Sequence, residues 1–183
     1  MNLPKTVLIL SLFGALLTGA CGYYFPHIYD GPAKTIYMPN WKNRTSQLGL
    51  DSEIYQTLSR WFQKSGAITL TKNREEAEMI LAGEIVNIDL PSVSWDANAR
   101  SSEAKVKLVV RYILKDIQSD EILWEVPSET WTEAYSTTGG SSERTEAEKQ
   151  ALEQIITDLS ERIYIGTLSK LRKANMKKNE EEQ

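Results

Sequence analysis

The side chains best suited to covalent chemistry in this chain are its single cysteine, Cys21, and its single histidine, His27. A hydrolytic triad needs a base such as histidine beside a nucleophile, and a zinc site needs several cysteine or histidine ligands. His27 lies six residues after Cys21 in an aromatic stretch, and we interpret it as an ordinary polar contact. Gly139 and Gly140 lack the spacing and the lysine of a phosphate-binding loop. The sequence therefore predicts a protein that is not an enzyme and has neither a metal site nor a cofactor.

A different chemistry is open to Cys21 because of the residues that precede it. Lys5 gives a positive start, an uncharged apolar run covers residues 7–17, and small residues occupy 18–20. This is the pattern of a secretory signal peptide, and the run is shorter than the roughly 20 residues that span a bilayer. The pattern also resembles the lipobox of bacterial lipoproteins, in which the cysteine thiol receives a diacylglycerol and the chain is cut before it. Leu17 stands one residue further from the cysteine than in the usual box.

We therefore expect residues 1–20 to be a signal peptide and Cys21 to be the site of lipid attachment. The alternative is a cleaved signal followed by a cysteine with no role, but no second cysteine is present to form a disulfide. Two or three acyl chains would hold the protein on a membrane, since each buried methylene contributes about 0.8 kcal/mol. Gly22 follows the cysteine where an aspartate could stand. By analogy with enteric lipoproteins, this favours the outer membrane.

The composition is that of a globular protein that does not bind nucleic acid. Apolar residues make up 41% of the chain and charged residues 25%, and the net charge is −4. Nucleic-acid binding needs a net basic surface. We expect residues 21–33 to form a lipidated tether, residues 34–171 a single domain, and residues 172–183 a charged, disordered tail.

Hydrophobic periodicity within the expected domain predicts strands and helices in the order β-α-β-β-β-α. The predicted strands are residues 35–38, 79–90, 103–115 and 121–135, and the predicted helices are residues 50–64 and a long segment from residue 145. Both helices have one apolar face. This pattern predicts an α+β fold with two layers, in which the helices pack on one side of the sheet. The other side of the sheet would face solvent or a partner.

The last two predicted strands are joined by about five residues, which predicts a hairpin. A register in which the numbers of facing residues sum to 236 pairs opposite charges on one face and apolar residues on the other. The charged pairs are Lys115 with Glu121, Arg111 with Glu125, and Lys107 with Glu129. The apolar pairs are Leu114 with Ile122, Tyr112 with Trp124, and Val110 with Val126.

The basic side chains Lys105, Lys107 and Arg111 are candidates for contact with anionic groups such as phosphates. The alternative is that the hairpin glutamates neutralise them. Lys105 differs from the others because Trp131 would stand opposite it in the predicted register.

Several segments, taken in order, resemble the lipopolysaccharide-assembly lipoprotein family (LptE-like). The resemblance covers about residues 20–170 and includes a late amphipathic helix. The segments are Cys21-Gly-Tyr-Tyr-Phe, Ile36-Tyr-Met-Pro-Asn-Trp-Lys-Asn43, Ala77-Glu-Met-Ile-Leu-Ala-Gly-Glu-Ile85 and Ile122-Leu-Trp124.

This resemblance implies a two-layer sandwich of a mixed four-stranded β-sheet with two α-helices on one face. It also implies an outer-membrane lipoprotein that plugs an LptD-type β-barrel, helps the barrel to assemble and binds lipopolysaccharide on its way to the cell surface. Lys105, Lys107 and Arg111 are the candidate lipopolysaccharide contacts. The alternative function is a periplasmic lipoprotein that activates a cell-wall synthase, or one of the curli-secretion type.

Overall fold

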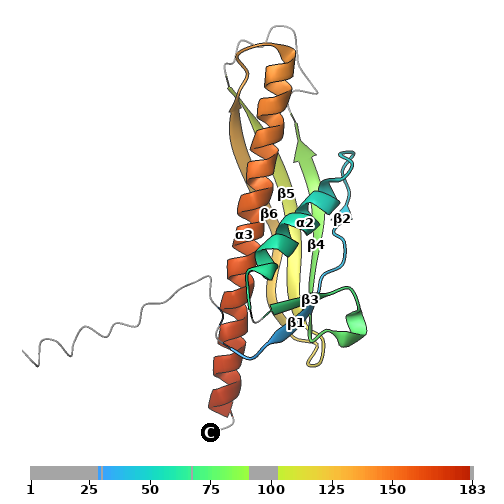
Figure 1. Cartoon of the computed structure of the whole chain (residues 1–183), viewed down its shortest axis with the longest axis vertical. Coiled ribbons are helices and arrows are strands. Elements are labelled where there is room, and N and C mark those ends of the chain that lie inside the picture. The colour runs from blue at the N-terminus through green and yellow to red at the C-terminus, as the bar shows by residue number, and fades with distance from the viewer. Residues whose placement is uncertain (1–28, 30, 67, 91–102, 182–183) are drawn as a thin grey trace, which may run out of the picture.

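The computed structural model describes residues 29, 31–66, 68–90 and 103–181. The strands are β1 (Lys34–Tyr37), β2 (Lys42–Asn43), β3 (Ile68–Thr71), β4 (Met79–Asp89), β5 (Glu103–Asp116) and β6 (Ile122–Ser136). The helices are α2 (Leu50–Gln63), the short 3-10 helix η2 (Arg74–Glu76) and α3 (Ser141–Glu181). Figure 1 shows α2 and α3 side by side on one face of the sheet. The predicted α+β architecture is confirmed.

The sheet contains six strands where four were expected, because the short strands β2 and β3 also pair. The strand order is β3-β1-β4-β5-β6, and β2 pairs with β4 farther along the edge that β1 occupies. β1 is parallel to β3 and β4, while β4, β5 and β6 are antiparallel in succession. The sheet is therefore mixed, with β6 at one end of the order.

The two helices cover the sheet with continuous apolar stripes. In α2, Leu50, Ile54, Leu58 and Phe62 recur every four residues, which places them on one helix face, and all are buried. In α3, the apolar face predicted from the sequence is also buried, and it includes Ile155, Leu159 and Ile163. These residues form one core with the inward side chains of the strands.

α3 approaches β6 closely at Gly166. A Cβ atom added to this glycine would lie 2.2 Å from the ring of Trp124, so only glycine leaves room for the indole. The helix continues to Glu181, which differs from the disorder expected for residues 172–183. Leu171 is buried and Asn175 donates a hydrogen bond of 2.5 Å to the hydroxyl of Tyr29. Tertiary contacts thus support a helical segment whose composition alone suggested a tail.

The predicted hairpin register is wrong. β5 and β6 do pair antiparallel, but Leu114 lies opposite Trp124 and Val110 lies opposite Glu129. The pairing shifts twice along β5, and each shift places one additional residue in β6. Because side chains alternate between faces, one additional residue moves every following side chain to the other face.

The shifts separate the β6 glutamates from their predicted partners. Glu125 lies opposite Ile113 on the face away from the helices. Glu129 lies on the helix side, where its carboxylate accepts a hydrogen bond of 2.8 Å from the hydroxyl of Tyr112. Pro127 stands at one of the shifts, and a proline without an N–H is tolerated at a bulge in an edge strand.

Arg111 instead pairs across the sheet with Glu84 of β4. The two residues are Cα partners in the β4–β5 register, and the Arg111 Nε atom donates to a Glu84 carboxylate oxygen at 2.7 Å. Glu84 is only 8% exposed, so its carboxylate needs cationic or hydrogen-bonding partners to remain charged. The cross-strand ion pairing predicted for Arg111 thus exists, but with the strand on its other side.

A double-mutant cycle tests this pairing. We expect Arg111→Met and Glu84→Gln to show a coupling energy of about 1 kcal/mol in the free energy of unfolding, measured in urea, because Arg111 Nε and Nη2 both donate to Glu84 but the guanidinium is half exposed to solvent. The matched cycle of Arg111→Met with Glu125→Gln should show coupling near zero. Strong coupling of Arg111 to Glu125 without coupling to Glu84 would contradict the observed register and support the predicted one, in which the numbers of facing residues sum to 236.

Candidate functional site

The face of the sheet away from the helices, here called the open face, carries alternate side chains of β5. The inward residues of this strand from Val106 to Leu114 are at most 2% exposed. The outward residues are half-buried or exposed, as the alternating pattern of β5 requires. They are Lys105, Lys107, Val109, Arg111, Ile113 and Lys115.

A carboxylate held by two guanidinium groups lies at the centre of the open face. Arg111 reaches Glu84 from β5, and Arg44 pairs with the other Glu84 oxygen from the segment after β2. Both arginine side chains remain about half exposed. Lys42 is the Cα partner of Glu84 in the parallel β2–β4 pairing. Three cationic side chains therefore surround one buried carboxylate, and the cluster has a positive balance.

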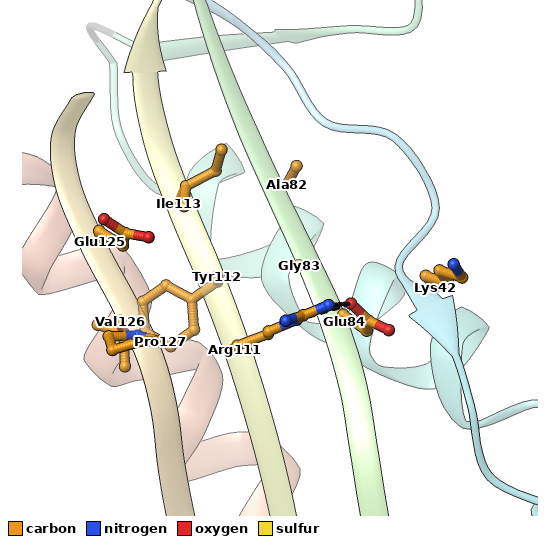
Figure 2. Close-up of a pocket in the computed structure, with 10 residues that line it drawn as sticks. All are labelled: Lys42, Ala82, Gly83, Glu84, Arg111, Tyr112, Ile113, Glu125, Val126 and Pro127. Atoms are coloured by element: carbon orange, nitrogen blue, oxygen red, sulfur yellow. Dashed lines mark hydrogen bonds and ion pairs between the residues drawn. The ribbon is translucent and has the colours of Figure 1, made fainter. Parts of the chain in front are cut away.

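A groove of about 330 Å³ lies beside this cluster (Figure 2). Its floor contains the small residues Ala82 and Gly83, and its wall on the β6 side includes Pro127. The other lining residues are Lys42, Glu84, Arg111, Tyr112, Ile113, Glu125 and Val126. The groove thus combines apolar walls with the cations Lys42 and Arg111 at one side and the carboxylate of Glu125 at the other, which suits a ligand with both aliphatic and polar parts.

The floor of the groove at Gly83 depends on the packing behind it. A Cβ atom added to Gly83 would lie 2.3 Å from the indole of Trp41, which packs against the opposite side of the sheet. Trp41 also contacts the ring of Tyr112, with 6.2 Å between ring centroids. Gly83 therefore leaves room for the indole on the helix side of the sheet.

Tyr112 is a structural hydrogen-bond donor in this arrangement. Burial raises the pKa of its hydroxyl, and the hydrogen bond to the Glu129 carboxylate raises it further. The hydroxyl therefore stays protonated at neutral pH and cannot act as a base there. In the described ranges, no group of three or more His, Cys, Asp or Glu side chains could hold a metal ion.

The structure separates the three candidate binding residues. Lys105 and Lys107 are exposed on the open face, whereas Arg111 is engaged by Glu84. The prediction that Lys105 lies opposite Trp131 is wrong, because its β6 partner is Ala134. Cys21 and His27 lie outside the described residues.

The sequence did not point to Lys42, Arg44 or Glu84 as members of the cluster. β2 contains only two residues, so it has no periodicity that could be recognised. Its parallel pairing with β4 nevertheless places Lys42 beside Glu84, and the backbone N–H of Arg44 donates to the Ile85 carbonyl at 3.0 Å. Only the tertiary fold brings these side chains to the same point as Arg111.

No helix in the described part of the chain is both long enough and apolar enough to cross a bilayer. α3 has the length, at 41 residues, but its outward face is polar.

Solved structures that align with this chain include several lipoproteins. A crystal structure of a protein from Xanthomonas campestris is 14% identical with a TM-score of 0.56, and the match covers 81% of this chain and 94% of that one. Lipoprotein B from Nitrosomonas europaea is 16% identical with a TM-score of 0.49, covering 79% and 88%. A minor lipoprotein from Acinetobacter baumannii is 13% identical with a TM-score of 0.43, covering 74% and 91%. No curated protein matches the chain.

The sequence also matches a family model. Residues 33–165 match the model of the lipopolysaccharide-assembly family LptE. The matched segment extends from the residue before β1 into α3, so it includes the open face and most of the helical layer. The resemblance seen in the sequence is confirmed, and the family acts in assembly and not in catalysis. The chain therefore belongs to the LptE family of lipopolysaccharide-assembly lipoproteins.

Proposed function

We propose that this protein is an outer-membrane lipoprotein that acts with an LptD-type β-barrel as its plug and assembly factor, and that it binds lipopolysaccharide during transport to the cell surface. The observation that carries this proposal is the family match over residues 33–165, which includes all of the sheet. The domain would sit on the periplasmic side of the membrane or within the barrel lumen.

The polarity of the surface supports a role as a plug. The lumen of a large outer-membrane barrel is polar, so a protein within it needs a polar outer surface. The open face carries lysines, arginines and threonines between its half-buried apolar residues. The outward side of α3 is also polar, with Gln150, Glu153, Gln154 and Thr157 exposed. Both outer layers of the domain therefore suit a hydrated lumen.

The exposed lysines of β5 support lipopolysaccharide binding. Lys105 and Lys107 project from the open face, and ammonium groups bind phosphates through charge-assisted hydrogen bonds. Arg111 and Arg44 are less available because Glu84 engages both guanidinium groups, whereas Lys42 adds positive charge to the lining of the groove. The groove offers apolar walls next to these cations. We assign the anionic part of the ligand to Lys105 and Lys107.

Copurification of the partner and depletion of the chain test the function as a whole. We expect the full-length chain, affinity-purified from envelope membranes, to bring down a large outer-membrane β-barrel that mass spectrometry identifies. Depletion of the chain should lower the amount of assembled barrel and of surface lipopolysaccharide. A cell-wall synthase as the main copurifying protein, with normal surface lipopolysaccharide after depletion, would support the alternative function instead.

Lipid attachment at Cys21 can be tested by substitution. We expect Cys21→Ala to move the protein from the membrane fraction to the released fraction, because the acyl chains contribute the free energy of anchoring. Immunoblots of carbonate-washed membranes would measure this change. A Cys21→Ala chain that stays in the washed membranes of cells depleted of the barrel would show that another segment anchors the protein.

The assignment of Lys105 and Lys107 predicts a loss of affinity. The variant Lys105→Gln/Lys107→Gln should bind purified lipopolysaccharide at least about tenfold more weakly, because each charged hydrogen bond contributes roughly 1.5–3 kcal/mol. Lys72→Gln/Lys149→Gln removes the same charge from two exposed lysines elsewhere. Isothermal titration would compare the two variants with the unchanged chain, and equal affinities for all three would refute the assignment.

A further inference from the structure

A second group of basic side chains lies at the C-terminal end of α3, far from the groove on the open face. A cavity of about 520 Å³ lies between the last turns of α3, the β5–β6 turn and the first residue of β1. Its cationic lining residues are Lys34, Lys170, Lys173, Lys177 and Lys178. We call this cavity the basal groove.

The basal groove has a surplus of positive charge. Asp116 and Glu121 are the carboxylates in its lining, against five lysines. The Asp116 carboxylate already accepts hydrogen bonds of 2.9 Å from the backbone N–H groups of Gln118 and Ser119. Lys34 pairs with Glu78 at 2.7 Å, and the other four lysines of the lining belong to α3.

The lysines of α3 share a direction because of their spacing. Lys170, Lys173 and Lys177 stand at intervals of three and four residues, which places them along one side of a helix. Lys173 and Lys177 are exposed, and Lys170 is half-buried. The three ammonium groups therefore form a row beside the cavity, where an extended anionic surface could meet all of them.

The same end of α3 holds the chain close to the expected lipid anchor. Tyr29 is buried, and its hydroxyl accepts the hydrogen bond from Asn175, which itself lines the basal groove. Eight residues connect Tyr29 to Cys21, and a segment of this length spans at most about 28 Å. If Cys21 carries acyl chains, the basal groove must lie within that distance of the bilayer. Figure 1 shows the start of β1 beside this part of α3.

We propose that the basal groove binds the phosphate groups of anionic phospholipids in the leaflet that holds the anchor; this inference rests on the proposed lipidation of Cys21. The ammonium group of lysine is a compact point charge that suits a phosphate, and a basic cluster next to a lipid anchor is a second membrane signal. The contact fixes the orientation of the domain, with the C-terminal end of α3 toward the bilayer.

The fixed orientation separates two kinds of anionic contact along β5. Asp116, at the end of this strand, lines the basal groove, whereas Lys105 and Lys107 stand near its start. Nine residues of extended strand separate Lys107 from Asp116, which is about 30 Å. The open-face lysines are therefore held away from the phospholipid surface and stay available for another ligand.

A fluorescence experiment on the lipidated full chain tests the proposal. Asn179→Cys places a thiol for a fluorophore near the basal groove. Only this thiol reacts with the fluorophore, because the thiol of Cys21 is blocked by its lipid. The chain is reconstituted in phosphatidylethanolamine vesicles that contain either phosphatidylglycerol or phosphatidylcholine, with a nitroxide-headgroup lipid as quencher. We expect stronger quenching in the phosphatidylglycerol vesicles, and loss of this difference at high salt.

Matched variants in the labelled background identify the lysines. Lys173→Gln/Lys177→Gln should lower the ratio of docked to undocked chains in the phosphatidylglycerol vesicles roughly thirtyfold. Each lysine near an anionic surface contributes about 1 kcal/mol to the free energy of binding. Lys149→Gln/Arg162→Gln removes the same charge from exposed positions earlier on α3 and should leave the ratio close to that of the unchanged chain. Circular dichroism confirms that each variant is folded.

The outcomes separate this proposal from the proposed function. Equal quenching in both vesicles, or quenching that both double variants reduce alike, overturns the phospholipid contact while the anchor stands. Stronger quenching only when lipopolysaccharide is added assigns the groove to that ligand and also overturns the proposal. A chain that does not float with either vesicle overturns the lipidation of Cys21. The phospholipid contact then also falls, because no lipid anchor would hold the basal groove near a bilayer.

Discussion

The structure depends on the fact that two helices cover only one face of a six-stranded sheet. α2 and α3 bury the inward residues of β4, β5 and β6, and the approach of Trp124 to Gly166 brings α3 close to the edge strand. Since the inward residues of β5 are almost completely buried, the register of this strand is fixed relative to the helices. Every outward residue of β5 is then committed to the open face. The basic row of the open face follows directly from this one-sided coverage.

The ion pairs of the open face follow from the same constraint. Glu84 lies at the middle of β4 with little exposure, and an unpaired carboxylate there would be costly. Arg111 and Arg44 reach it from the two neighbouring segments and so join the central strands at their outward side. Lys105 and Lys107 lie farther along β5 and remain exposed. Two arginines therefore stabilise the sheet while the lysines of β5 stay available for an anionic ligand.

Much of the fold could be predicted from the sequence, because long segments with one buried face leave a clear periodicity. The alternation along β5 and the stripe of α3 both correspond to residues that are buried in the structure. The hairpin register could not be predicted, since one additional residue at each of two places in β6 inverts its alternation and leaves the stretches between the shifts looking regular. β2 is too short to show a pattern. The last turns of α3 were missed because they depend on contacts such as Asn175 with Tyr29, which sequence composition does not reveal.

The site was only partly predictable for a related reason. Lys105 and Lys107 could be chosen from charge and alternation within one strand, and both are on the open face. Arg44 and Lys42 come from a separate segment that parallel pairing brings beside Glu84. A cationic cluster built from three segments leaves no continuous motif. The family match shows the general role, and the arrangement of charges on the open face supplies the residues that carry it in the proposed function.

The most direct test of the account is to ask which face of the domain contacts lipopolysaccharide in living cells. A photoreactive phenylalanine analogue can be placed at Thr132, which lies opposite Lys107 on the open face, and at Gln154, which is exposed on the outward side of α3. The account predicts crosslinks to lipopolysaccharide from Thr132 and none from Gln154. Crosslinks from Gln154 together with none from Thr132 would contradict it.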